Sequence, residues 1–255
     1  MLGFIGTGAI TEAIITGLYK CGNYQEKILI SERSRDRSAK LHDLFPSVEI
    51  VTDNQSIVDR CDDIVIAVLP DQAQTVLSSL QFRSQHRVVS VVAGIKLDVL
   101  SALIKPATQV CRAIPMPPIE FGLGPVPICP RDERAEALFN RVGTAVAVDN
   151  EAQFTALATG SSVMAAFFEL VASLARWLEQ RNVPAKEASL YATNVIHSLA
   201  CLTIKSDAST LQTMSEQCLT VGGLNEQVLL GCKDAGWIEI MQKELDRIMT
   251  RLEKS

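Results

Sequence analysis

Hydrophobic and polar positions follow two different patterns along the 255 residues of the chain. In the first 150 residues, short runs rich in valine and isoleucine are followed by amphipathic stretches, as TEAIITGLYKCG follows MLGFIG. Near-continuous apolar runs are typical of parallel strands buried on both faces, and the stretches between them have the period of covering helices. The pattern predicts an α/β domain with a mostly parallel sheet. The expected strands are MLGFIG, EKILISE, VEIVT, DIVIAVLP, RVVSVVAG, TQVCRAIP, LGPVPICP and TAVAVD.

After about residue 150 no convincing strand pattern returns, and the remaining segments have a helical period. The longest, EAQFTALATGSSVMAAFFELVASLARWLEQRN, is apolar on more than one face, and a helix that is apolar all round has to be buried. We therefore expect two domains, an α/β domain over residues 1–150 and an all-α domain over residues 151–255. The small helical domain buries this helix alone or against a second copy, so we expect a homodimer or a higher homo-oligomer.

Composition mainly excludes classes of partner. A net charge of −5 and a pI of about 5.3 disfavour nucleic acid, which selects a basic face. The seven cysteines are odd in number and have no CxxC spacing, so we expect neither a disulfide framework nor a metal site. MLGFIG lacks the basic segment of a secretory signal, and apolar runs such as VSVVAGI are too short to span a membrane. These features predict a cytoplasmic protein that binds no membrane.

The first expected strand runs into a glycine-containing loop, GFIGTGAITEAI, which opens a helix. Gly6 permits the tight turn, Gly8 lets a pyrophosphate approach the backbone, and the helix start offers free N–H groups to an anion. Thr11 stands where the usual pattern has a third glycine, and an ordinary tight turn is the alternative interpretation. The loop predicts a dinucleotide-binding Rossmann domain. The predicted cofactor contacts in this loop are Gly6, Thr7, Gly8, Ala9 and Ile10.

The second expected strand ends in ILISERSRDR, where dinucleotide sites meet the adenosine ribose. An acidic residue there binds the ribose 2′-hydroxyl, so Glu32 favours NAD. Guanidinium groups suit a 2′-phosphate, so Arg33 with Ser34 favours NADP. Arg35 and Arg37 are equally well interpreted as a solvated charged loop. We predict NADP as the cofactor, with NAD as the open alternative.

Two later strands end at positions that line a ligand groove in open α/β sheets. Pro70 follows one of these strands and Gly94 the other, and simple strand termination is compatible with the same residues. We predict that both contact the cofactor, together with their neighbours Leu69 and Ala93.

Six segments occur in the order seen in pyrroline-5-carboxylate reductases: GFIGTGAI, AVLP, VVSVVAGIKLDVL, CRAIPMPP, ATGSSVMAAF and VGGL. The chain resembles this family over nearly its whole length. The resemblance implies a Rossmann domain followed by an all-α dimerisation domain whose helices interlock with those of a second subunit. It also implies hydride transfer from NAD(P)H to the C=N carbon of a carboxylated cyclic imine, and 1-pyrroline-5-carboxylate would yield proline.

The resemblance departs from the family near the expected substrate. In CRAIPMPP, Arg112, Pro115 and Pro118 match the family motif, whereas Met116 and Pro117 replace an asparagine and a threonine. The resemblance implies that Pro115 contacts the cofactor and that Met116 contacts the substrate. The exchanged side chains leave the identity of the imine open.

The segment TVGGLNEQ replaces the family's Ser-Pro-Gly-Gly-Thr-Thr. Glycines permit backbone geometry closed to other residues, and N–H groups at a helix start suit a substrate carboxylate. Asn225 is similar in position to the family's second threonine, whose hydroxyl faces the imine nitrogen, and it is our candidate catalytic residue; its amide donates hydrogen bonds but is a poor proton source. The alternative is an ordinary helix start, and Glu226 weakens anion binding there unless it points away. The predicted substrate contacts are Met116, Gly222, Gly223, Leu224 and Asn225.

Three other functions stay open. A β-hydroxyacid dehydrogenase resembles its relatives in a lysine four residues after a glycine, but Met164 follows Gly160 at that spacing. The altered substrate motifs favour a reductase of a different imine. Met116 and Asn225 also favour a catalytically silent NAD(P)-binding homologue.

Overall fold

The computed structural model describes residues 1–206 and 211–253, which form two compact units. The first unit runs from Met1 to Ala158 and takes in the chain again from Leu252, and the second spans Thr159–Arg251. The predicted boundary between residues 150 and 151 thus lies eight residues before the end of the first stretch. The reason is that Glu151 and Phe154 pack against Arg112 of the sheet. The functional division into a cofactor domain and a substrate domain stays a prediction.

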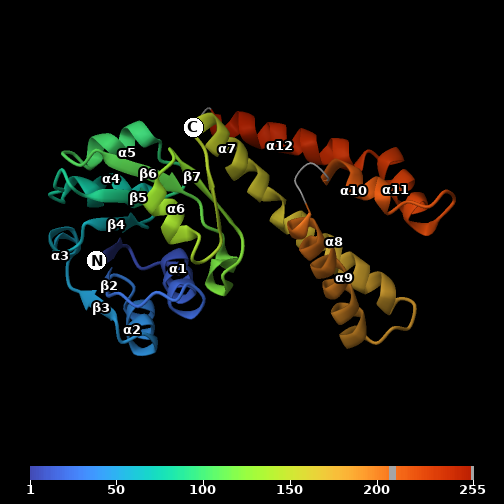
Figure 1. Ribbon diagram of the computed structural model, residues 1–255, viewed down its shortest axis with the longest axis horizontal. Coiled ribbons are helices and arrows are strands. Elements are labelled where there is room, and N and C mark those ends of the chain that lie inside the picture. Colours follow the sequence, from blue (N-terminus) through green and yellow to red (C-terminus); the bar gives the residue numbers. More distant parts are fainter. Residues whose placement is uncertain (207–210, 254–255) are drawn as a thin grey trace. The chain divides into compact units, whose positions relative to one another are not determined.

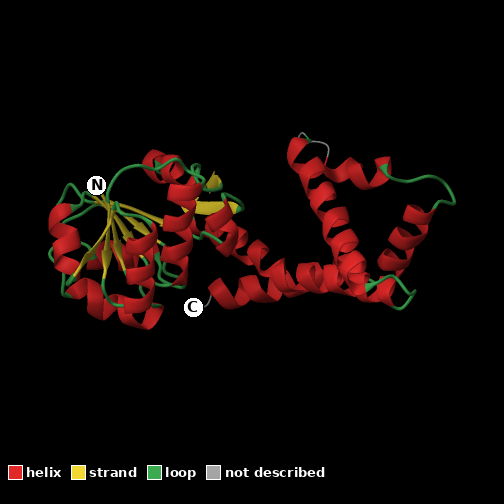
Figure 2. Cartoon of the chain, turned by 90° about the horizontal axis from the view of Figure 1, so that it is seen from below, coloured by secondary structure: helices red, strands yellow, loops and turns green. Residues whose placement is uncertain are grey.

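The first unit is built on one eight-stranded sheet with the order β3-β2-β1-β4-β5-β6-β7-β8 (Figures 1 and 2). Neighbouring strands are parallel except for β6 and β7. The eight predicted strands and the α/β fold class are confirmed. The strands are β1 Leu2–Ile5, β2 Ile28–Ser31, β3 Val48–Val51, β4 Asp63–Ile66, β5 Arg87–Ser90, β6 Gln109–Ala113, β7 Pro125–Cys129 and β8 Thr144–Ala147.

Helices cover both faces of this sheet, and the two-residue period of the strands sorts their side chains between two cores. On β1, Phe4 packs into the core shared with α1 and α6, whereas Ile5 packs into the core shared with α3, α4 and α5. β2 divides in the same way, with Ile30 on the first face and Leu29 on the second. The helices are α1 Ala9–Lys20, α2 Arg35–Leu44, α3 Asn54–Arg60, α4 Pro70–Ser78, α5 Leu97–Leu103, η1 Pro117–Phe121, α6 Glu133–Phe139 and α7 Glu151–Gly160.

The second unit is all helical, as predicted. Its elements are η2 Ser161–Val163, α8 Met164–Glu179, α9 Ala185–Lys205, α10 Leu211–Gln217, α11 Leu224–Asp234 and α12 Trp237–Glu253, whose last two residues belong to the first unit. Helices α8 and α9 pack against each other. The buried apolar residues described in this unit are the small side chains Ala175, Ala188 and Ala192, while many large ones are exposed. The unit therefore has little core of its own.

Helical residues Glu151–Glu179 form one run that is long and apolar enough to cross a membrane by length and composition alone. Only 6% of its most apolar window is buried inside the structure. Core helices of soluble proteins pass the same test. The run therefore indicates that something covers its apolar side chains, but it does not identify what covers them.

Candidate functional site

The turn from β1 to α1 has the geometry that its two glycines predict. Gly6 has a φ of +101°, and a Cβ atom there would lie 2.5 Å from the carbonyl oxygen of Ala67. Gly8, the residue before α1, is different, because a Cβ atom would meet nothing within 4 Å. Gly6 is therefore required by the fold, whereas Gly8 keeps the space beside the helix start open.

Two threonine hydroxyls hold this turn from the inside. Thr7 donates to the carbonyl oxygen of Ser31 at 2.7 Å, and Thr11 donates to the carbonyl oxygen of Gly6 at 2.8 Å. Thr11, which stands where the usual pattern has a third glycine, thus bonds to the backbone of the turn. The first N–H groups of α1 have no partners within the helix, and they remain the natural donors to an anion.

A cavity of about 340 Å³ lies beside this turn at the carboxyl ends of β1 and β4. It brings together seven of the predicted cofactor residues: Gly6, Thr7, Gly8, Ala9, Arg33, Ser34 and Leu69. It is also lined by Arg37 and by three residues that the sequence pattern did not single out, namely Ala67 and Val68, which follow β4 directly, and Gln72 in the first turn of α4. An open glycine, a helix start and two arginines fit the pyrophosphate and a further phosphate of a dinucleotide.

Arg37 is held at the wall of this cavity and is more than part of a solvated loop. Its Nε donates to Glu12 at 3.1 Å, and Lys40 donates to the other oxygen of the same carboxylate at 2.6 Å. The hydrogen bond from Lys40, aided by Arg37, lowers the pKa of Glu12 although burial opposes the shift. Glu12 therefore stays charged and anchors Arg37 beside the groove.

Glu32 faces a different cavity, of about 310 Å³, beyond the end of β2. It forms an ion pair with Arg35 at 3.6 Å, while Arg33 lines both cavities. The cavity beside the glycine turn is thus lined by Arg33 and Arg37 but not by Glu32, which shares the other cavity with Arg33 and Arg35.

Other predicted cofactor residues lie elsewhere in the first unit. Ala93 and Gly94 line a third cavity of about 310 Å³, and Gly94 has a φ of +75° that explains the glycine. Ile10, Pro70 and Pro115 line none of these three cavities in the described part of the chain. Their contacts with a cofactor stay predictions.

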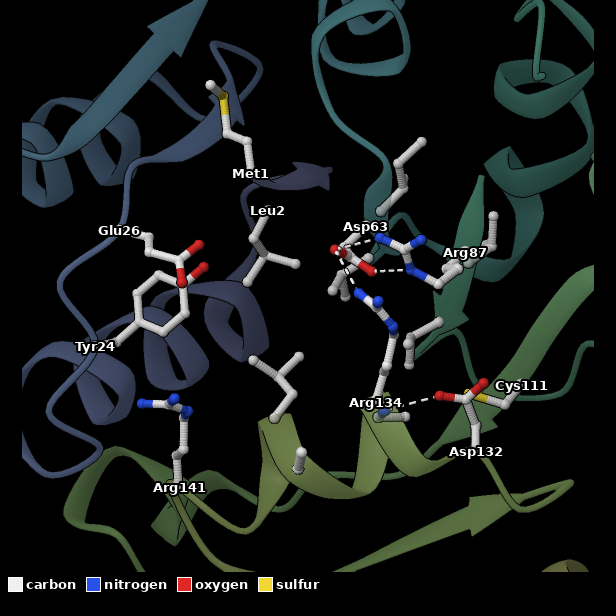
Figure 3. Close-up of a pocket in the computed structure, with 17 residues that line it drawn as sticks. Met1, Leu2, Tyr24, Glu26, Asp63, Arg87, Cys111, Asp132, Arg134 and Arg141 are labelled. Carbon is white, nitrogen blue, oxygen red and sulfur yellow. Dashed lines mark hydrogen bonds and ion pairs between the residues drawn. The ribbon is translucent and has the colours of Figure 1, made fainter. Parts of the chain in front are cut away.

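A fourth cavity, of about 290 Å³, opens at the amino ends of the strands (Figure 3). There Arg87 of β5 holds the carboxylate of Asp63 of β4 with two hydrogen bonds of 2.6 and 2.8 Å, and Arg134 approaches it to 3.9 Å. Burial raises the pKa of Asp63, but the hydrogen bond and charge of Arg87 outweigh it, so the pKa is lowered. Ligands of open α/β sheets bind at the opposite edge, and we assign this cluster to the fold.

Residues 220–227 of the second unit, called the glycine elbow below, form the predicted turn, but polar groups within the turn already bind one another. Gly222 has a φ of +71°, and Gly223 precedes α11. The Glu226 carboxylate accepts the N–H of Gly222 at 2.6 Å, and the Asn225 amide donates to the carbonyl oxygen of Cys218 at 3.1 Å. The carboxylate thus points into the loop and takes one of the donors expected for a substrate.

The five predicted substrate residues are distributed over both units. Met116 precedes η1 in the first unit, whereas in the second unit Gly222 and Gly223 precede α11 and Leu224 and Asn225 begin it. Leu224 is strongly exposed. Their assembly into one site stays a prediction.

The reversal of strand order at β1, the glycine turn and the basic cavity define an NAD(P)-dependent oxidoreductase of the Rossmann class with a helical second unit. A family model described as "NADP oxidoreductase coenzyme F420-dependent" matches residues 1–94.

Comparison with individual proteins extends the relation beyond the first unit. Pyrroline-5-carboxylate reductase of Haemophilus influenzae is 27% identical and covers 90% of this chain and 88% of its own; that of Mycobacterium tuberculosis is 28% identical and covers 89% and 78%. The reductase structure from Coxiella burnetii superposes with a TM-score of 0.87 at 23% identity, covering 99% of this chain and 97% of its own. The Plasmodium falciparum reductase structure, solved with NADP bound, has a TM-score of 0.83 at 17% identity with the same coverage. The resemblance is confirmed: the chain is similar over nearly its whole length to pyrroline-5-carboxylate reductases.

Substitution of Gly6 and of Gly8 distinguishes an effect on the stability of the fold from an effect on NADPH binding. We expect Gly8→Ala to leave the melting temperature nearly unchanged and to weaken NADPH binding about tenfold, because its methyl group enters open space. Gly6→Ala should instead destabilise the protein by about 1–3 kcal/mol, because it combines a positive φ with a backbone clash. Thermal unfolding and titration calorimetry check both. Unchanged NADPH binding by Gly8→Ala would show that the cofactor does not lie beside this turn.

Proposed function

We propose that the protein reduces a carboxylated cyclic imine with NADPH, and that this imine is 1-pyrroline-5-carboxylate, which yields proline. The relation to pyrroline-5-carboxylate reductases over nearly the whole chain carries the proposal. The open space at Gly8 and the basic cavity beside it support the dinucleotide. Consumption of NADPH with this imine, at roughly 1–1000 turnovers per second, and chromatographic detection of proline test the proposal.

The chemistry requires a hydride at the imine carbon and a proton at the imine nitrogen, and the reduced nicotinamide supplies the hydride. A protonated C=N bond already accepts hydride well, so the protein contributes chiefly position. We propose that Asn225 faces the imine nitrogen and orients it. Its amide must then exchange the carbonyl oxygen of Cys218 for the substrate, and water or the iminium itself supplies the proton.

Arg33 and Arg37 support NADP over NAD, because both line the cavity beside the pyrophosphate turn while Glu32 pairs with Arg35. We expect Arg37→Ala to weaken NADPH binding about tenfold and to leave NADH binding unchanged, because only NADPH carries the additional phosphate. Lys40→Ala is the matched control, since Lys40 shares Glu12 with Arg37 but does not line this cavity. Equal losses for the two cofactors would place the 2′-phosphate elsewhere.

Glu226 is the residue that most directly opposes a substrate carboxylate at the elbow, because it already accepts the N–H of Gly222. We expect Glu226→Gln to lower KM for 1-pyrroline-5-carboxylate about five- to tenfold with kcat little changed, since a neutral amide removes the like charge. Glu239→Gln is the matched control, because Glu239 also lies in the first turn of a helix, α12. An unchanged or raised KM in Glu226→Gln would mean that the substrate carboxylate does not bind at the elbow.

The same contact favours a second candidate function, a reductase of an imine without a carboxylate. A built-in carboxylate at Gly222 leaves less attraction for an anionic substrate. Steady-state rates with 1-pyrroline, compared with 1-pyrroline-5-carboxylate, distinguish the two candidates. A silent homologue would bind NADPH and reduce neither compound.

We propose that the helical unit pairs with a second copy of the chain. Support comes from exposed large apolar side chains along α8 and α9, among them Phe167, Phe168, Trp177, Leu190, Tyr191 and Leu202. A membrane is disfavoured as the cover, because α8 carries the ion pair of Glu169 and Arg176, and charged groups are costly in lipid. The seven free thiols support a reducing, cytoplasmic location.

Light scattering after size exclusion tests this pairing. We expect a mass of twice the 27.8 kDa chain, or a higher multiple, without detergent. A monodisperse monomer, or a protein that needs detergent to stay in solution, would contradict the pairing.

A further inference from the structure

An ion pair between a buried arginine and a part-exposed glutamate joins three segments of the first unit near the carboxyl ends of β5 and β6. Arg112, in β6, is nine-tenths buried, and its Nη1 donates to Glu151 Oε1 at 2.6 Å. The same carboxylate oxygen accepts the N–H of Leu97 at 3.0 Å. The guanidinium carbon of Arg112 lies 4.7 Å from the ring centroid of Phe154. Glu151, at the start of α7, therefore connects α7 to both β6 and α5.

Glu151 acts as a remote cap for α5. Leu97 is the first residue of that helix, and its N–H has no partner within the helix. Lys96, the residue before the helix, provides no side-chain cap. A carboxylate from 54 positions further along the chain takes this role.

The loop between β5 and α5, residues 91–96, is thus held at both ends. At its start the N–H of Val91 donates to the carbonyl oxygen of Ile66 on β4 at 2.9 Å. At its end it meets Leu97, which is held by Glu151. The middle of the loop carries Ala93 and Gly94, both exposed. The pair thus holds the residue at which this loop ends.

This pair is a costly way to hold a loop. The Nε of Arg112 is buried and has no hydrogen-bond partner in the described part of the chain. An unpaired buried donor is destabilising, and an ion pair whose carboxylate is part-exposed contributes little net stability because solvent screens it. The arrangement is better explained by the geometry that it fixes than by the stability that it adds.

Strand order indicates what the loop is positioned for. The pyrophosphate turn follows β1, and the basic residues expected at the adenosine end follow β2 on one side of it. The loop of residues 91–96 follows β5 on the other side. A dinucleotide that extends across the switch point therefore has its nicotinamide end on the side of this loop.

We propose that Arg112 and Glu151 are positioning residues that set the loop of residues 91–96 against the nicotinamide end of the cofactor. The inference rests on the proposed NADPH-dependent function. Neither side chain is placed in contact with the reacting atoms. Their effect is transmitted through the backbone at Leu97.

Two ligands distinguish an effect on the position of the loop from an effect on the stability of the whole protein. NADPH spans the groove, and 2′,5′-ADP reproduces only its adenosine end. We expect Glu151→Ala to weaken NADPH binding about tenfold in calorimetry and to leave 2′,5′-ADP binding within about twofold of wild type. Glu151→Gln should be intermediate, since its amide oxygen still accepts from Leu97. Asp149→Asn is the matched control, because it removes only the exposed pair with Arg131 and should change neither affinity.

The outcomes are distinguishable. Equal weakening of both ligands by Glu151→Gln would make the pair purely structural, and unchanged NADPH binding by a folded Glu151→Ala would remove its role. Both results would overturn the inference while the proposed function stands. If the wild-type protein binds neither ligand, the cofactor assignment fails, and the inference fails with it.

Discussion

The close approach of Gly6 to the backbone after β4 is the constraint on which the rest of the first unit depends. Its positive φ turns the chain from β1 into α1, and a Cβ atom would collide with the carbonyl oxygen of Ala67. The turn occurs where the strand order reverses, between β2 on one side and β4 on the other. One backbone conformation therefore places a helix start, a basic strand end and the groove at a single point.

The second unit, in contrast, buries few apolar side chains within itself. Its buried apolar side chains are alanines, while phenylalanines, leucines and a tryptophan on α8 and α9 stay exposed. The hydrophobic effect is proportional to the apolar area removed from water, so these helices gain most from a cover outside the chain.

The strands and the glycine turn were predictable because each depends on local sequence. Apolar runs such as Ile28–Ser31 have both faces buried, so their composition alone identifies them. Thr11 shows the limit of a motif, because its hydroxyl bonds to the backbone of Gly6 where a glycine was expected. The compact units divide eight residues later than the predicted boundary, because helical period does not reveal that Phe154 is buried against Arg112.

The contacts at the candidate site were less predictable because they depend on rotamers and on distant segments. Charge alone warned that Glu226 would disturb an anion, but only the structure shows its carboxylate on the N–H of Gly222. The pair of Arg112 and Glu151 joins residues 39 positions apart, and nothing local signals it. Arg37 was ambiguous because its role depends on the anchor that Glu12 provides from another helix.

The most direct test of the proposed reaction is isotope transfer from NADPH that carries deuterium on the reactive carbon of the nicotinamide. The protein is incubated with this cofactor, labelled separately on each face, and with 1-pyrroline-5-carboxylate, and the product is analysed by mass spectrometry. We expect proline with one deuterium, on the ring carbon that was part of the C=N bond, from one of the two labelled cofactors. Proline without deuterium from either cofactor, or no proline although NADPH is bound, would contradict the proposed reaction.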